Sequence, residues 1–366
     1  MKGQRISRIG GLLLLAVWLG LTAFAWLQPA KAFSQTERRP LTQLPEFSGE
    51  EVLSGKFTEN FEKYTLDQFP FRESFRQTKA LFHRYVLGQR DNNGIYIANG
   101  YAAKMEYPLN EKSVSHALGT FEKIYNAYLK NSGSTVFASV IPDKGYYLAE
   151  SSGYLTMDYP KLFSLVQQGM PWAAHIDITD CLSIEDYYFT DTHWRQERLL
   201  PVAKRLSEVM GLTLPQEGDF SVTAVQQPFY GVYYGQAALP MEPEKMYLME
   251  SHWLKGCRVY NYEKEAYTPV YDLSRLDGSD LYEVYLSGAQ SLLTIENPNA
   301  TTDRELIVFR DSFGSSLVPL LTRDYAKVTL VDVRYIPVQR LKNYLDFHGQ
   351  DVLFLYSTLA LNSNAL

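Results

Sequence analysis

The sequence predicts an α/β protein: a parallel β-sheet covered by helices, interrupted by a β-rich insertion and preceded by an apolar N-terminal helix. Short apolar runs alternate with amphipathic segments from about residue 94 to residue 211, and again from residue 306 onward. This alternation is typical of parallel strands joined by crossover helices. Between the two stretches, residues 213–304 are rich in Tyr, Val, Gly and Pro and contain short alternating segments, which indicates the insertion.

The first stretch contains one clear buried strand and one clear helix. Residues 135–141 form an apolar run that Pro142 closes, as expected of a strand. Residues 110–130 carry an apolar stripe at helical spacing, with Asn110 as the expected N-cap. Weaker patterns predict strands at residues 94–97 and 174–178 and helices at residues 159–168 and 195–210.

The second stretch begins with the apolar run 306–309, which predicts a buried strand that ends at Arg310. The remaining elements are strands at residues 327–331 and 351–356 and helices at residues 315–322 and 337–347. Within the insertion, alternating segments predict strands at residues 222–225, 282–286 and 292–295.

The N-terminus has the composition of an export signal. Lys2, Arg5 and Arg8 precede the uncharged run Ile9–Leu27, and Ala30-Lys31-Ala32 resembles a signal-peptidase site. The run is about as long as a membrane span, which needs roughly 20 residues. Residues 1–32 are therefore either a cleaved signal peptide or an uncleaved signal anchor. Both alternatives place the rest of the chain outside the cytoplasm, secreted or anchored to the outer face of the cytoplasmic membrane.

Two further regions follow this segment. Residues 33–90 are expected to be a polar tether and a helical segment, which Pro70 divides. Residues 91–366 are expected to be one α/β domain, interrupted by the insertion at residues 213–304.

Composition and charge exclude some functions. The chain has 366 residues and a net charge of -6, with no basic block, so a nucleic-acid partner is not expected. Neither Cys181 nor Cys257 lies in a C-x-x-C pair, and their pairing with each other stays open. We find no set of metal ligands, because Asp191 and His193 lack a convincing third. No cofactor is expected.

An acid, an imidazole and a hydroxyl are the side chains that nucleophilic serine chemistry needs. Ser312 follows a predicted core strand, where nucleophiles tend to be exposed. Asp191 lies two positions before His193, so that in an extended segment the carboxylate can orient the imidazole. Gly314 and Ser315 are expected to turn the backbone so that N–H groups form an oxyanion hole. The structural alternatives are that Ser312 and Asp191 only cap helices.

Four other residues follow strands at the expected carboxyl edge of the sheet, where ligands of open α/β sheets gather. Asp143 and Lys144 follow the strand at 135–141, and Arg334 and Tyr335 follow the strand at 327–331. We expect these four side chains to contribute to substrate binding.

Four short motifs together resemble the DHHW family, which is similar to the alginate O-acetyltransferases with an SGNH-hydrolase-like domain. The motifs are Asp67-Gln68-Phe69-Pro70-Phe71-Arg72, Asp191-Thr192-His193-Trp194, Asp311-Ser312-Phe313 and Asp332-Val333-Arg334-Tyr335. The resemblance implies a flavodoxin-like three-layer fold with Ser312 as nucleophile, His193 as base and Asp191 as its partner. Thr192 departs from the family's name motif, which has His at this position, and the serine follows the histidine in the chain, the reverse of ordinary SGNH esterases.

The resemblance also implies a function. It suggests an extracytoplasmic O-acetyltransferase that modifies a cell-surface or secreted polysaccharide, with a membrane-bound acyltransferase as acetyl donor. The enzyme alternative is a secreted carbohydrate esterase, in which water accepts the acetyl group. The other alternative is an inactive glycan-binding or assembly protein with a vestigial triad.

Overall fold

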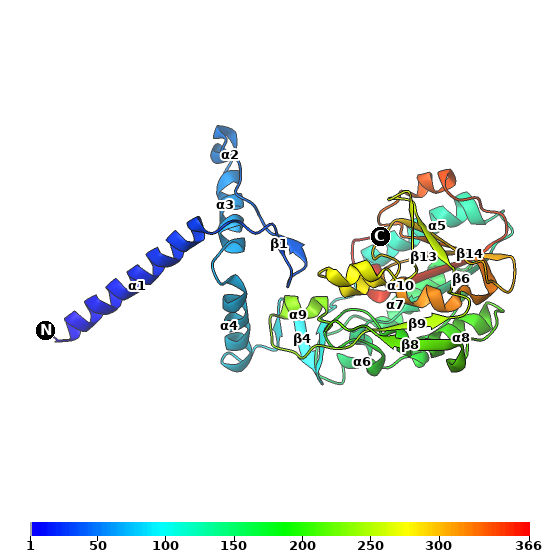
Figure 1. Ribbon diagram of the computed structural model, residues 1–366, viewed down its shortest axis with the longest axis horizontal. Coiled ribbons are helices and arrows are strands. Elements are labelled where there is room, and N and C mark those ends of the chain that lie inside the picture. Colours follow the sequence, from blue (N-terminus) through cyan, green and yellow to red (C-terminus); the bar gives the residue numbers. More distant parts are fainter. Residues whose placement is uncertain (1) are drawn as a thin grey trace. The chain divides into compact units, whose positions relative to one another are not determined.

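The structure, a computed structural model, describes residues 2–366 and the side chains from Ile9 onward. The basic side chains of Lys2, Arg5 and Arg8 therefore lie outside the described residues. The chain forms two compact units. Figure 1 shows the ribbon coloured from the N-terminus to the C-terminus. Unit 1 comprises residues 1–93 and 235–240, and unit 2 comprises residues 94–234 and 241–366.

Unit 1 is mostly helical. Its first helix, α1 (Lys2–Leu27), contains an unburied stretch with a mean hydropathy of 2.0, long and apolar enough to cross a membrane or to act as a signal sequence. The apolar N-terminal helix expected from the sequence is thus present. The other elements are β1 (Phe33–Ser34), β2 (Arg39–Pro40), α2 (Gly49–Leu53), α3 (Lys56–Asp67), α4 (Arg72–Tyr85) and β3 (Asp91–Asn92). As expected, Pro70 lies between two helices, α3 and α4.

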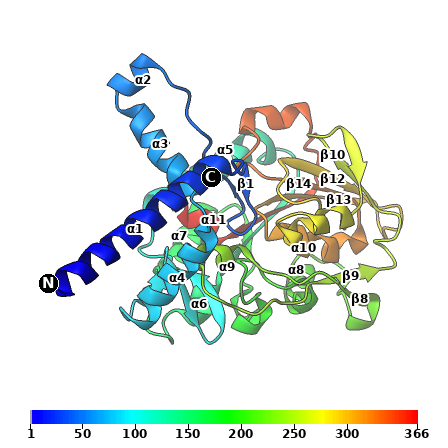
Figure 2. The ribbon, with the colours of Figure 1, turned by 60° about the vertical axis from the view of Figure 1, so that its left-hand side comes forward.

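Unit 2 is built on an eight-stranded sheet. Its order is β11-β10-β12-β14-β13-β15-β6-β7, and Figure 2 shows four of these strands, β10, β12, β13 and β14, near one another. The bounds are β6 (Thr135–Ile141), β7 (Ala174–His175), β10 (Arg258–Asn261), β11 (Ala266–Thr268), β12 (Leu292–Glu296), β13 (Arg304–Arg310), β14 (Tyr325–Val331) and β15 (Asp351–Ser357). Strands β14, β13, β15, β6 and β7 are parallel, which confirms the expected core of the fold.

The insertion contributes strands to this same sheet. Strand β12 pairs antiparallel with β14, and β10 and β11 continue the antiparallel edge. The sheet is therefore mixed, whereas the strand pattern predicted a parallel one. The pattern of side chains along a strand does not specify its pairing partner. The sequence therefore did not predict that strands of the insertion join the main sheet.

Helices cover both faces of the sheet and make three layers. On one face, α5 (Glu111–Ile124) and α7 (Tyr159–Gly169) pack with Ile307 and Phe354 in a single apolar cluster. On the other face, α8 (Leu200–Val209) packs with Val308 and Leu353. Neighbouring residues of one strand thus enter opposite cores, because successive side chains of a strand point to opposite faces.

The remaining elements of unit 2 are short. They are β4 (Ile95–Ala98), β5 (Tyr101–Lys104), α6 (Lys144–Leu148), β8 (Phe220–Ala224), β9 (Tyr247–Ser251), α10 (Gly314–Leu317) and α11 (Thr358–Asn362). Helix α9 (Val232–Ala237) begins in unit 2, and its residues from Gly235 onward belong to unit 1. The strand expected at residues 282–286 is instead the 3-10 helix Leu281–Val284. The reason is local: the Asp280 side chain accepts the Tyr282 N–H at 3.0 Å and caps a helical turn.

Two segments of the second α/β stretch that were expected to be α-helices are wholly or partly 3-10 helices. Helix α10 has four residues and continues as the 3-10 helix Val318–Asp324. Pro319 supplies no backbone N–H there, which removes a donor from the α-helical pattern. The helix expected at residues 337–347 is the 3-10 helix Val338–Asn343.

Candidate active site

The turn after β13 carries Ser312 and is fixed by its neighbour Asp311. The Asp311 carboxylate accepts the Phe313 N–H at 3.0 Å through Oδ1. Its Oδ2 accepts the backbone N–H and the hydroxyl of Ser357, at 2.8 and 2.6 Å, from the end of β15. Asp311 therefore holds the turn against an adjacent strand and leaves the Ser312 side chain half-buried at the carboxyl edge of the sheet.

A continuous hydrogen-bond relay joins Asp191, His193 and Ser312. Asp191 Oδ1 lies 2.6 Å from His193 Nδ1 and also accepts the His193 backbone N–H at 3.0 Å. His193 Nε2 lies 2.8 Å from Ser312 Oγ. The structure thus brings together residues that are 119 positions apart in the sequence, at distances suited to proton transfer.

Aromatic side chains fix the imidazole plane. Tyr282 stacks on the His193 ring with centroids 3.8 Å apart and planes at 6°, and Phe313 approaches the ring at 4.9 Å. The Tyr282 hydroxyl lies 2.7 Å from Ser316 Oγ, which also accepts the Trp194 indole N–H at 3.0 Å. These contacts leave the imidazole little freedom to rotate away from Ser312.

The loop at residues 230–232 fixes the acid. Asp191 is fully buried, and its Oδ2 accepts the Val232 N–H at 2.9 Å. The Gly231 N–H donates to Thr190 Oγ1 at 2.8 Å. A Cβ atom on Gly231 would lie 2.2 Å from Asp191 Cα, so only glycine allows this approach. Gly231 was not expected in the site, because nothing local in the sequence ties it to a residue 40 positions earlier.

Lys144 is buried against the backbone that precedes Asp191 in the chain. Its ammonium donates to the backbone carbonyls of Ala102, Tyr188 and Phe189, the last two at 3.0 and 3.3 Å. Burial lowers the pKa of Lys144 to about 7, while the charges of Asp191 and Glu244 oppose this shift. Three carbonyl acceptors match the three N–H groups of an ammonium. Lys144 therefore supports the backbone next to the relay.

Glu244 and Asp143 are also enclosed. The Glu244 carboxylate accepts the Thr190 N–H at 3.0 Å, and burial raises the pKa of Glu244. Asp143 accepts the Gly145 N–H at 2.6 Å and contacts the hydroxyls of Tyr159 and Thr358, and burial raises its pKa as well. The described contacts of Asp143 are thus internal to the protein.

The second predicted binding pair lies nearer the solvent. The Arg334 guanidinium donates to both oxygens of Asp332, at 2.8 and 2.6 Å. Burial alone would lower the pKa of Arg334, but the Asp332 carboxylate outweighs it and raises the pKa. The Tyr335 side chain is exposed, and the Arg334 guanidinium lies 5.3 Å from its ring. A binding role for these four residues stays a prediction.

The backbone amides after Ser312 make hydrogen bonds within the turn. The Gly314 N–H donates to the Asp311 carbonyl at 3.2 Å, and the Ser315 N–H donates to the Ser312 carbonyl at 3.1 Å. The Gly314 and Ser315 N–H groups are therefore used within the turn itself, and an oxyanion hole formed by N–H groups of this turn stays a prediction. These hydrogen bonds follow from the tight helical geometry of the turn, in which each amide bonds the carbonyl three residues earlier.

The part of the chain that the structure describes holds neither a cluster of metal ligands nor a disulfide. Among the residues that the structure describes, no group of three or more His, Cys, Asp or Glu side chains could hold a metal ion. Cys181 and Cys257 are both free, and burial raises the pKa of the Cys257 thiol to about 11.

The three-layer α/β fold is the one that the resemblance implied, and the structure joins Asp191, His193 and Ser312 in one hydrogen-bonded relay at the carboxyl edge of its sheet. The model of the DHHW protein family matches residues 183–331, which contain all three relay residues. The expected resemblance to the DHHW family is therefore confirmed over this region.

Solved structures show the same fold. A DHHW family protein from Eubacterium siraeum is 19% identical, with a TM-score of 0.58 over 75% of this chain and 94% of that chain. PatB1 of Bacillus cereus is 15% identical, with a TM-score of 0.59 over 74% of this chain and 98% of that chain. PatB1 is also known with a sulfonyl adduct. A comparison with curated protein sequences gave no match.

Proposed function

We propose that this chain is an extracytoplasmic O-acetyltransferase that modifies a cell-surface or secreted polysaccharide through an acyl-serine intermediate. The observation that carries the proposal is the relay: Asp191 to His193 at 2.6 Å and His193 to Ser312 at 2.8 Å. Because the serine is half-buried and the acid is fully buried, solvent and substrate reach the nucleophile but not the carboxylate.

The first half-reaction loads the serine. His193 Nε2 accepts the hydroxyl proton as Ser312 Oγ attacks the carbonyl carbon of an acetyl ester. The carbon–oxygen bond to the donor then breaks, and His193 returns the proton to the leaving oxygen. Asp191 Oδ1 holds the Nδ1–H throughout, which fixes the tautomer and stabilises the imidazolium that forms.

The second half-reaction transfers the acetyl group. A sugar hydroxyl gives its proton to His193 and attacks the acetyl-serine, and the Ser312 oxygen leaves and recovers a proton from His193. In an esterase, water would take the place of the sugar in this step. The two activities therefore share one site and differ only in the acceptor.

The oxyanion needs a donor other than the amides of Gly314 and Ser315, which bond within the turn. The Ser312 N–H makes no hydrogen bond to any described part of the chain. It lies on the residue whose Oγ attacks, so it is placed to donate to the developing negative charge. We assign it as the first oxyanion donor.

Acetyl groups must reach this site outside the cytoplasm. The apolar helix α1 fits an export signal or an anchor. A membrane-bound acyltransferase that passes acetyl groups across the bilayer is the donor implied by the resemblance to the alginate O-acetyltransferases. We therefore propose a polysaccharide acceptor and a membrane-bound donor as the partners.

An acetyl-ester assay with purified protein tests the proposal. With p-nitrophenyl acetate as donor, we expect intact-mass analysis to detect one acetyl group on the wild type. We expect none on Ser312→Ala and a normal signal on Ser315→Ala, which makes the same change in the same turn.

The acceptor is then tested directly. Oligosaccharides of mannuronate and of N-acetylglucosamine are added, and their acetylation is followed by mass spectrometry. Acetylated sugar supports the transferase. Acetate alone at saturating sugar would indicate the esterase, and no serine-dependent acetylation would indicate an inactive binding protein.

A further inference from the structure

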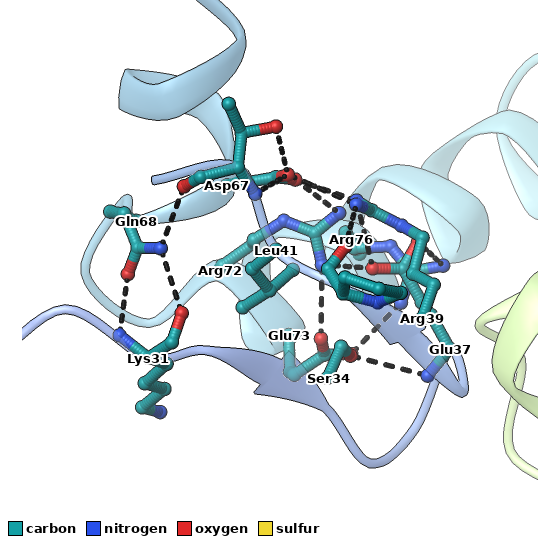
Figure 3. Close-up of polar contacts among 12 residues, drawn as sticks. Lys31, Ser34, Glu37, Arg39, Leu41, Asp67, Gln68, Arg72, Glu73 and Arg76 are labelled. Atoms are coloured by element: carbon teal, nitrogen blue, oxygen red, sulfur yellow. Dashed lines mark hydrogen bonds and ion pairs between the residues drawn. The ribbon is translucent and has the colours of Figure 1, made fainter. Parts of the chain in front are cut away.

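The turn at residues 67–72, which carries the Asp-Gln-Phe-Pro-Phe-Arg motif, lies in unit 1 and takes no part in the relay. It joins α3 to α4, and Figure 3 shows its polar side chains directed at the segment that follows α1. That segment, residues 28–43, contains the predicted signal-peptidase site. The contacts between the turn and the segment explain what the motif does.

Gln68 binds the backbone of Lys31 at two points. The Lys31 N–H donates to Gln68 Oε1 at 2.9 Å, and Gln68 Nε2 donates to the Lys31 carbonyl at 2.9 Å. The same Nε2 donates to the Thr42 carbonyl at 3.0 Å. Gln68 is only 7% exposed, so without these partners its amide would be buried and unsatisfied.

Asp67 binds the far end of the segment. Its carboxylate accepts two hydrogen bonds from the Arg39 guanidinium, at 2.6 and 3.0 Å, and the Thr42 N–H at 2.9 Å. The Arg39 hydrogen bonds hold the pKa of Asp67 well below its usual range. Arg72 pairs with Glu37 and Arg76 lies 3.3 Å from Glu37, so the middle of the segment is also held.

The turn also contacts the last residues of α1. The Phe71 ring stacks on the Phe24 ring, with centroids 5.9 Å apart and planes at 6°. The Gln28 side chain donates to the Gln68 carbonyl at 2.9 Å. Phe71 is 64% exposed, and Phe69 and Phe75 are exposed beside it. Aromatic rings next to the end of an apolar span are typical of the interface between membrane and water.

These contacts occupy the predicted cleavage site. A peptidase binds its substrate as an extended strand through free backbone N–H and C=O groups. Here both backbone groups of Lys31 bond to Gln68, and the Ala32 carbonyl accepts the Leu41 N–H at 2.9 Å. Cleavage after Ala32 would remove Lys31 and, with it, two of the three hydrogen bonds of the buried Gln68 amide, leaving only the one to the Thr42 carbonyl.

We propose that the 67–72 turn is a juxtamembrane clamp, which keeps α1 attached as a membrane anchor and seats Phe69, Phe71 and Phe75 in the surface of the lipid bilayer. Its partner is thus the bilayer next to the anchor. The clamp is independent of the catalytic proposal, because it involves only residues of unit 1.

The mature N-terminus tests retention of the anchor. The full chain is expressed in a bacterial host, extracted from the membrane fraction and measured by intact mass. The clamp predicts a protein that contains α1. A mature protein that begins at Phe33 would overturn the proposal.

Trypsin tests the clamp itself in nanodiscs of phosphatidylethanolamine and phosphatidylglycerol. Trypsin cuts after Lys31, and we expect Gln68→Ala to be cut there about tenfold faster than the wild type, since two hydrogen bonds that close the site are lost. Gln77→Ala removes an exposed glutamine of α4 and should match the wild type. Equal rates for all three proteins would contradict the clamp.

Lipid contact is measured on the same nanodiscs with a photo-crosslinking lipid head group. We expect adducts on the tryptic peptide 64–72, which contains Phe69 and Phe71. Adducts on α1 but none on this peptide would show that the turn lies away from the bilayer.

Discussion

Substitution of Gly231 by alanine tests whether the 230–232 loop positions the acid of the relay. The new Cβ would lie 2.2 Å from Asp191 Cα and 2.3 Å from its N and Cβ. Carbon atoms in contact stay at least about 3.5 Å apart, so the two backbones must separate by about 1.3 Å. That movement also stretches the 2.9 Å bond from the Val232 N–H to Asp191 Oδ2.

The expected loss follows from this displacement. A misplacement of about 1 Å near catalytic groups costs about 100-fold in rate, or about 2.7 kcal/mol of transition-state stabilisation. Crowding of a packed site also lowers the free energy of unfolding, by about 1 to 3 kcal/mol. We therefore expect kcat/KM for p-nitrophenyl acetate to fall about 100-fold in Gly231→Ala, while the protein stays folded.

The control is Gly119→Ala, which makes the same change in helix α5 where no atom lies within 4 Å. It should keep wild-type kcat/KM and unfold at the same temperature or slightly higher, because alanine favours helix. Thermal unfolding of both variants separates misplacement from loss of the fold. A folded Gly231→Ala protein with wild-type kcat/KM would refute the argument that this loop positions Asp191.

Three other perturbations follow from the contacts described. Asp191→Asn should lower kcat by about 10⁴-fold with the fold intact, because an amide stabilises the wrong tautomer of His193. A variant with the wild-type kcat in an esterase assay would contradict the assignment of Asp191 as the acid of the relay. Lys144→Met leaves the buried carbonyls of Ala102 and Tyr188 without their Lys144 donor, whereas the Phe189 carbonyl keeps the Ala102 N–H at 2.7 Å, so the free energy of unfolding should fall by about 3 kcal/mol. The exposed Lys112→Met should leave the free energy of unfolding unchanged in denaturant titration. The pKa of Asp67 is depressed in the folded state, so its ionised carboxylate stabilises the folded clamp. This stabilisation is fully present above the unfolded pKa of about 3.9 and is lost as the pH falls below that value. Hydrogen exchange of residues 28–43 should therefore show constant protection from about pH 7 to about pH 5 and a loss below about pH 4; a loss already at about pH 6 would contradict it.

The parts of the site that the sequence predicted are those with a local signal. Asp191 and His193 are two positions apart in an extended segment, and Ser312 directly follows a core strand, so their pattern is visible without the fold. Their mutual distances depend on how the sheet is ordered, which the strand pattern alone does not give. The family resemblance supplied that step.

The parts that the sequence did not predict depend on contacts between distant segments. Tyr282 stacks on His193 from a 3-10 helix that its alternating apolar pattern presented as a strand. Gly231 is one glycine among 23, and only the approach of Asp191 shows why it must be one. The hydrogen bonds that the Gly314 and Ser315 amides make within the turn were also not visible in the sequence, because the local backbone geometry decides which carbonyl each amide reaches.

The two ends of the eight-stranded sheet are very short: β11 has three residues and β7 has two. An open strand edge displays unpaired N–H and C=O groups that can capture a strand from another molecule. Short edge strands offer few such groups, and Pro269 directly after β11 and Pro171 shortly before β7 further disfavour extension of the ladder. These blunt edges therefore protect the sheet against pairing with the sheet of another copy, which is the contact that starts edge-to-edge aggregation.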